Sequence, residues 1–144
     1  MASKSGAKIQ FNYFKTAFRL RQARKVTAWI EKIVKSEKAR VSSLTYVFCS
    51  DAYLLSINME YLNHDTLTDI ITFEYTENKG QLEGEIYISI PRVKENAAKL
   101  GVDFNTELRR VMIHGVLHLL GYSDKSKIQK ARMREKEEEC LGRW

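Results

Sequence analysis

The sequence predicts a single α+β domain in which a mixed sheet of about four strands packs against about five helices. Three observations support this fold class. The length of 144 residues suits one domain with its own hydrophobic core. Segments with helical apolar spacing alternate with short runs rich in β-branched and aromatic residues. The chain contains no internal repeat and no linker-like segment that would divide it.

The chain begins with a predicted strand, a helix and a second strand. Residues 9–14 form the first strand. Apolar residues recur at helical spacing between charged ones over residues 19–35, which predicts an amphipathic helix. The run SLTYVFC, residues 43–49, is rich in β-branched and aromatic residues and therefore predicts a buried strand.

A short helix and a hairpin follow. Ser50 or Asp51 caps a helix that extends through Tyr61. The runs ITFEY, residues 71–75, and GEIYISI, residues 84–90, have the composition of strands. The polar segment between them contains an asparagine and a glycine, which favour tight turns. We therefore expect these two strands to pair as a hairpin.

Three helices complete the predicted fold. Pro91 suits the first turn of a helix that ends at Gly101. A second helix is expected to begin near Asn105 or Thr106 and to end at Leu120, with Gly121 after its end as a C-cap. The last helix spans residues 126–141 and starts with the spacing of a capping box.

The composition is that of a globular protein in a reducing compartment. Hydrophobic residues make up 44% and charged residues 29% of the chain. The two cysteines, Cys49 and Cys140, form neither a CxxC motif nor the spacing of a disulfide framework. The sequence has no secretory signal and no apolar run of membrane-spanning length. We therefore expect a soluble, cytoplasmic protein.

The positive charge is concentrated near the N-terminus. The net charge is +6, but residues 1–40 hold eleven Lys or Arg and two acids, a charge of +9, which leaves −3 for the rest. Such a segment favours binding to a polyanion, most commonly a nucleic acid. A solvated helix face with a flexible basic start accounts for the same charge distribution.

The segment HGVLHLLGYSD has the pattern of a metal site. His114 and His118 lie four residues apart, so on a helix both imidazoles face the same side, as in zincin-type sites. Gly121 lets the chain turn out of the helix, and Asp124 can then supply a carboxylate, which zinc accepts as a ligand. The alternative is a core helix whose histidines bond to nearby polar groups.

This histidine segment belongs to a larger set of motifs. It is preceded by ELRRVMI and followed by MREKE, and the segments TDIITFEY and GEIYIS stand upstream. As a set, these motifs resemble the YbeY family of bacterial metal-dependent endoribonucleases and ribosomal RNA maturation factors. The resemblance covers roughly residues 43–141.

The resemblance implies one YbeY-like metallohydrolase domain over residues 9–144, after a flexible basic N-terminus of residues 1–8. It implies an HxxxHxxxxxH motif that binds zinc, with RNA and ribosomal proteins as partners. It also implies ribosomal RNA processing, notably at the 3′ end of the small-subunit RNA. His114 and His118 match the first two ligands, whereas Asp124 stands at the position of the third histidine. An anionic ligand makes bound water less acidic and can favour manganese or iron.

Leu62 is a second departure, because it stands where the family has an arginine that would position phosphate. Either another cation replaces that arginine, or the protein is mainly a non-catalytic RNA- or ribosome-binding factor with a structural metal.

No catalytic residue is assigned, but three are candidates. The possible roles of His64 are to bind phosphate, to act as a general acid, or to replace Asp124 as the third metal ligand. The alternative is a histidine in a surface loop without a role in the site. The possible roles of Asp69 and Glu85 are to orient a metal-bound histidine or to act on the attacking water. The alternative is that they cap turns or pair with Lys and Arg.

The sequence therefore predicts a zinc-dependent endoribonuclease that acts on ribosomal RNA through a metal-activated water. A peptide or small-substrate metallohydrolase is a weaker alternative, because Gly115 stands where HExxH enzymes have their general base. Arg109 and Arg110 either line an RNA groove or lie on an exposed helix face. The last helix has many i,i+4 charge pairs and is expected to be solvated, with Met133 and Glu137 serving packing.

Overall fold

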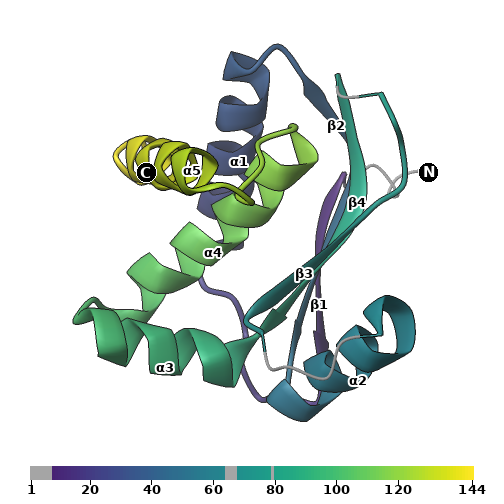
Figure 1. Cartoon of the computed structure of the whole chain (residues 1–144), viewed down its shortest axis with the longest axis vertical. Coiled ribbons are helices and arrows are strands. Elements are labelled where there is room, and N and C mark those ends of the chain that lie inside the picture. Colours follow the sequence, from purple (N-terminus) through teal and green to yellow (C-terminus); the bar gives the residue numbers. More distant parts are fainter. Residues whose placement is uncertain (1–7, 64–67, 79) are drawn as a thin grey trace.

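The computed structural model describes residues 8–63, 68–78 and 80–144, and within these ranges the central sheet has four strands in the order β1-β2-β4-β3 (Figure 1). The strands are β1 (Ile9–Phe14), β2 (Arg40–Cys49), β3 (Ile70–Glu74) and β4 (Gln81–Ser89). Strands β1 and β4 run parallel to β2, whereas β3 pairs antiparallel with β4. The sheet is mixed, and the predicted hairpin is confirmed.

Five helices pack around the sheet in the part of the chain that the structure describes. They are α1 (Ala23–Ser36), α2 (Asp51–Leu62), α3 (Ile90–Leu100), α4 (Phe104–Leu119) and α5 (Lys127–Leu141). Helix α2 lies on one side of the sheet, and the other four lie on the opposite side (Figure 1). No helix of the described ranges combines the length and the apolar character needed to cross a membrane. The predicted α+β class is confirmed.

The alternation of side chains along the strands separates two hydrophobic clusters. Tyr46, Phe48, Ile86 and Ile88 point into the main core, which they share with α1 and α4. Tyr87 lies between the two isoleucines and points to the other face, where it packs against the smaller cluster under α2. The sheet therefore supports α4 on one face and is covered in part by α2 on the other.

Helix α4 runs through the main core and lies close against the sheet. Its buried apolar residues are Leu108, Val111, Met112, Ile113, Val116, Leu117 and Leu119. A Cβ atom added to Gly115 would lie 2.8 Å from Cδ1 of the fully buried Ile86. Position 115 therefore faces the sheet and has no space for the glutamate of an HExxH motif, which strengthens the argument against that type of metalloprotease.

Some element ends differ from the prediction. Helix α1 begins at Ala23 rather than at residue 19, because Gln22 has φ 56°, in the left-handed region that interrupts a right-handed helix. The backbone N–H of Leu20 instead donates to the Tyr13 hydroxyl at 3.1 Å. Strand β2 begins at Arg40 rather than at residue 43, because its first residues pair with the start of β4.

Candidate metal centre

Helix α4 carries both histidines near its C-terminal end. Asp103 caps the helix by accepting a hydrogen bond from the Thr106 N–H at 3.0 Å, and the apolar residues hold the helix in the core. The Nε2 atoms of His114 and His118, one helical turn apart, are separated by 3.0 Å. Their side chains are 18% and 29% exposed. Both imidazoles therefore meet at a surface that solvent reaches.

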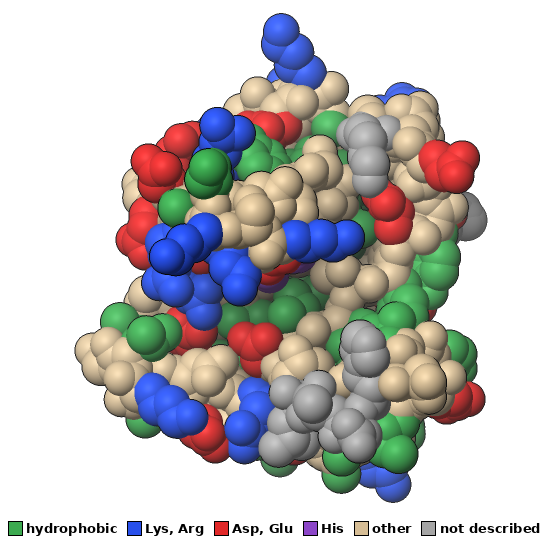
Figure 2. Space-filling view, in the orientation of Figure 1, with side chains coloured by type: hydrophobic (Ala, Val, Ile, Leu, Met, Phe, Trp, Pro, Cys, Tyr) green, Lys and Arg blue, Asp and Glu red, His purple; other side chains and the backbone are tan. Residues whose placement is uncertain are grey.

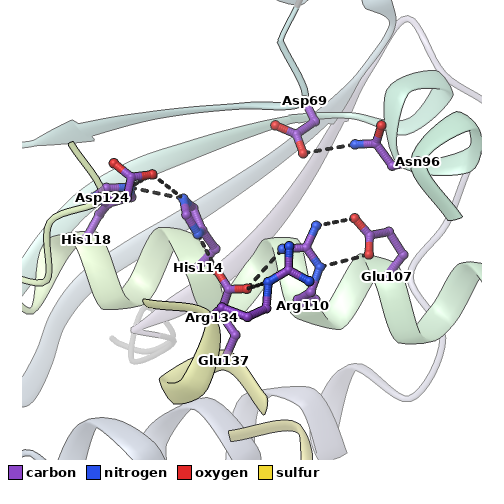
Figure 3. A network of polar contacts seen from close by, with 9 residues as sticks. All are labelled: Asp69, Asn96, Glu107, Arg110, His114, His118, Asp124, Arg134 and Glu137. Atoms are coloured by element: carbon purple, nitrogen blue, oxygen red, sulfur yellow. Dashed lines mark hydrogen bonds and ion pairs between the residues drawn. The ribbon is translucent and has the colours of Figure 1, made fainter. Parts of the chain in front are cut away.

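The turn after α4 brings Asp124 to the histidines. Gly121 has φ 108°, a conformation that favours glycine, and lets the chain reverse beside the end of the helix. Oδ2 of Asp124 then lies 3.5 Å from Nε2 of His114 and 3.4 Å from Nε2 of His118 (Figure 3). The structure therefore brings together the three residues that the sequence singles out as metal ligands.

The spacing of these three atoms suits a single metal ion. Around a four-coordinate ion with bonds of about 2.0–2.1 Å, ligand atoms lie about 3.3 Å apart. The distances of 3.0, 3.4 and 3.5 Å between the atoms of His114, His118 and Asp124 bracket that value. Potential ligand atoms of all three residues lie within 4.8 Å of one another. Two imidazoles and one carboxylate are also donor types that zinc accepts.

A buried carboxylate from α5 orients His114. Glu137 is 3% exposed, and its Oε2 lies 2.5 Å from Nδ1 of His114 (Figure 3). Oε1 of Glu137 accepts a hydrogen bond from Nη1 of Arg110 at 3.0 Å, and Nε of Arg110 donates to Glu107 at 2.9 Å. Because an ionised carboxylate can only accept, Nδ1 of His114 donates to Glu137, and Nε2 is the ring nitrogen that faces the other two candidate ligands.

The expectations about these helices are met in part. Most of α5 is exposed and Met133 is buried, as expected, but Glu137 is also buried and its carboxylate bonds a histidine in addition to packing. Of the two alternatives for Arg110, the exposed helix face does not hold, since Arg110 lines the hollow beside the candidate ligands, is 17% exposed and is paired with Glu107 and Glu137. The available signal was the position of Glu137 between Met133 and Cys140, on the apolar side of the helix.

The electrostatic environment favours an ionised Glu137 and a neutral His118. Burial alone raises the pKa of Glu137, but the hydrogen bonds and charges of His114 and Arg110 outweigh it and leave the pKa below 4.5. Burial, followed by the neighbouring His114, lowers the pKa of His118 below 6.5. A neutral imidazole is the form that binds metal ions, so both effects suit a metal centre.

A hollow of about 250 Å³ opens beside the three candidate ligands. Its lining residues are Asp69, Ile70, Arg110, Val111, His114 and Asp124. Figure 2 shows a groove between α5 and α3 in which histidine is visible, with Lys and Arg side chains along its upper rim. Oδ2 of Asp69 accepts a hydrogen bond from Asn96 at 3.2 Å, and burial raises the pKa of Asp69. Of the three catalytic candidates, Asp69 is thus placed beside the candidate ligands.

The other departures and candidates lie elsewhere. Glu85 is on the α2 face of the sheet, where it accepts hydrogen bonds from the hydroxyls of Tyr75 at 2.8 Å and Tyr87 at 3.2 Å. Leu62 ends α2 and is 42% exposed. His64 lies outside the described residues, as do residues 1–7 of the expected flexible N-terminus.

These features define a class of protein: a single-domain α+β fold whose central helix presents two histidines and an aspartate to one hollow, as a candidate mononuclear metal centre. Comparison with known families then gives a more specific assignment. The family described as Endoribonuclease YbeY matches residues 9–144. The chain therefore belongs to the YbeY family.

Individual relatives agree with this assignment. The chain is 49% identical over 133 residues to the endoribonuclease YbeY of Flavobacterium psychrophilum, which covers 92% of this chain and 94% of that protein. It is also 49% identical over 120 residues to the endoribonuclease YbeY of Amoebophilus asiaticus, with coverage of 83% and 82%. A Thermotoga maritima protein solved in solution has a similar fold, with a TM-score of 0.66, 30% identity and coverage of 93% and 91%.

Proposed function

We propose that the protein is a zinc-dependent endoribonuclease that processes ribosomal RNA, including the 3′ end of the small-subunit RNA, in the cytoplasm. Membership of the YbeY family, with relatives named endoribonuclease, supports RNA cleavage. The observation that carries the metal dependence is the convergence of His114, His118 and Asp124 beside one hollow. Ribosomal RNA and ribosomal proteins are the partners that this role requires.

The residues divide the chemical work in the following way. A bound divalent ion supplies Lewis-acid chemistry, because it makes a coordinated water more acidic and polarises a phosphoryl oxygen. His114, His118 and Asp124 would hold that ion, and Glu137, by accepting the Nδ1 proton of His114 in a hydrogen bond, directs Nε2 of that ring towards it. Asp69 lines the same hollow, and its raised pKa suits a carboxylate that accepts a proton from the attacking water or ribose 2′-hydroxyl.

One observation favours a second candidate function, a non-catalytic RNA-binding factor with a structural metal. Leu62 occupies the position of the arginine expected to bind phosphate. Arg110 lines the hollow, but its guanidinium is already paired with Glu107 and Glu137. Within the described ranges, this arginine is thus committed to carboxylates and does not replace the missing one.

A cleavage assay separates the two functions. Small-subunit ribosomal RNA fragments with an unprocessed 3′ end are incubated with the protein, with and without a chelator, and with the His114→Ala/His118→Ala double variant. An endoribonuclease cuts only with metal and with both histidines present. Intact RNA under all conditions, together with retained RNA binding, identifies the binding factor instead. Cleavage that resists both chelator and double substitution contradicts the metal centre.

A further inference from the structure

A second hollow lies beside α4, at the N-terminal end of α1. It has a volume of about 360 Å³, and Arg21, Asn105, Arg109 and Trp144 are among its lining residues. No Asp or Glu of the described ranges lines it. A cavity that exposes arginine and amide donors and no acidic side chain is suited to an anion.

This hollow is separate from the candidate metal centre. Asn105, Arg109 and Met112 line it and follow one another by four and three residues, so they share one face of α4. His114 follows Met112 by two residues and therefore lies about 200° further around the helix axis. A ligand in the second hollow does not occupy the histidine site.

Packing holds two cations at the Trp144 side of this hollow. The guanidinium carbon of Arg109 lies 4.4 Å from the centroid of the Trp144 ring, and Nζ of Lys25 lies 4.2 Å from it. The Trp144 ring in turn packs edge-on against the buried Trp29, with centroids 5.5 Å apart. The aromatic ring thus fixes both cations in place without neutralising their charge.

One donor in this arrangement lacks a partner. Nε of Arg109 is buried, and no group of the described residues accepts its hydrogen bond. Buried donors are seldom left unpaired in folded proteins, so such an atom commonly marks the place of an absent acceptor. Together with the lining of the hollow, this donor indicates an anionic oxygen ligand beside Arg109.

We propose that this hollow binds a phosphate group of an RNA strand, at a distance from the bond that the metal centre cuts. A phosphate oxygen can accept hydrogen bonds from the guanidinium of Arg109, and Arg21 and Asn105 add further donors. Lys25 and Arg109, which lie over the Trp144 ring, add positive charge beside the hollow and so favour a polyanion there. The proposal rests on the proposed function for RNA as the source of the phosphate; free phosphate has the same chemistry and is tested beside it.

The test measures binding of a fluorescein-labelled single-stranded RNA to the metal-free protein by fluorescence anisotropy over a series of salt concentrations. Arg21→Gln and Arg109→Gln are each expected to weaken binding about tenfold and to reduce the slope of log affinity against log salt by about 0.7. Arg24→Gln is the matched control, because this exposed arginine of α1 lines a different hollow. It is expected to weaken binding about twofold or less.

Several outcomes overturn the proposal. Equal losses for Arg24→Gln and Arg21→Gln mean that only the general positive charge acts. Inorganic phosphate is titrated in parallel while the indole NMR signal of Trp144 is followed, and a shift with phosphate but not with RNA assigns the hollow to a free anion. Arg21 is exposed and precedes α1, so its substitution tests the hollow even if Arg109→Gln unfolds. Because binding is measured in chelator, a failure to cleave RNA leaves this result intact.

Discussion

At the scale of single residues, substitution of Asp124 tests whether its carboxylate serves as a metal ligand in place of the third histidine of the expected HxxxHxxxxxH motif. Its Oδ2 already lies 3.5 and 3.4 Å from the two imidazole nitrogens. Asp124→Ala removes one of three ligands, so we expect the affinity for zinc to fall by more than about 100-fold. Asp124→His restores a nitrogen ligand and is expected to keep the metal. Elemental analysis after dialysis measures both, and an Asp124→Ala protein that retains its metal places the third ligand elsewhere.

Glu137 acts through His114 rather than on the metal, which gives its substitution a distinct signature. Glu137→Gln keeps the side-chain volume but removes the charge that orients Nδ1 of His114, so we expect zinc affinity to fall about 10- to 100-fold. Competition with a chromogenic zinc chelator measures this change. Glu138→Gln, an exposed neighbour on α5, is the control and should bind zinc like the parent. Equal zinc affinity in the two variants contradicts a positioning role for Glu137.

The contrast between Asp124 and Glu137 explains which part of the site can be predicted from sequence. Asp124 follows His118 by six residues, so a glycine turn and helical spacing are enough to place it. Glu137 is 23 residues from His114, and their contact depends on how α5 packs on α4. Helical spacing places Glu137 on the buried side of α5 but does not say which residue of α4 it contacts, so the sequence predicts packing and not the bond to His114.

At the scale of secondary-structure elements, Glu37 joins the end of α1 to α5 and to the turn that carries Asp124. Its carboxylate accepts a hydrogen bond from the Tyr122 hydroxyl at 2.9 Å and pairs with Nζ of Lys136 at 3.0 Å. Tyr122 precedes Asp124 by two residues, so this contact restrains the turn beside the metal centre. The same contacts make Glu37 a source of pH-dependent stability.

We expect Glu37→Gln to reduce the pH dependence of stability in the acid range. Burial raises the pKa of Glu37, but the hydrogen bonds of Lys136 and Tyr122 outweigh it and leave the pKa below 4.5. The unfolded chain thus binds more protons in this range, so the contribution of Glu37 is present above about pH 4.5 and is lost as the pH falls through the folded pKa. Because the pair is partly screened by solvent, it contributes about 0.5–1 kcal/mol.

Urea unfolding between pH 3 and pH 7 measures this contribution. The parent should exceed Glu37→Gln in free energy of unfolding at pH 7, and the difference should shrink towards pH 3. Glu31→Gln, an exposed substitution on the same helix, controls for the change in net charge. A difference between parent and Glu37→Gln that is constant with pH contradicts the assigned role.

Element boundaries were harder to predict than elements. The apolar spacing of α1 is visible in the sequence, yet its first residue is set by the left-handed Gln22, which no composition signal marks. The start of β2 likewise depends on pairing with β4, which is distant in sequence. Both errors arise because the deciding contact is tertiary, whereas the periodicity that predicts an element is local.

At the scale of the whole molecule, the sequence predicts the fold class but not the order of the strands in the sheet. Alternating strand and helix patterns with one hairpin were enough for a mixed four-stranded sheet and five helices, which the described ranges contain. The order β1-β2-β4-β3 was not predicted, because a chain that alternates strands and helices permits several parallel arrangements. That order puts β4 beside β3 and under α4, where Gly115 packs on Ile86 and lets α4 lie close to the sheet.

The metal centre also links ligand binding to the stability of the whole molecule. Two ligands come from α4 and the third from the turn after it, so the complete site exists only when the chain is folded. Zinc at about 100 times its dissociation constant should therefore add about 2.7 kcal/mol and raise Tm by about 10 °C.

Thermal unfolding with zinc and with chelator measures this linkage. The parent should melt at a higher temperature with zinc, whereas His114→Ala/His118→Ala should melt at the same temperature in both conditions, because the double variant lacks two of the three ligands. A zinc-dependent shift of equal size in the double variant would mean that the ion binds outside this centre. No shift in the parent would mean that the folded chain does not bind zinc more tightly than the unfolded chain, which contradicts a preformed site at His114, His118 and Asp124.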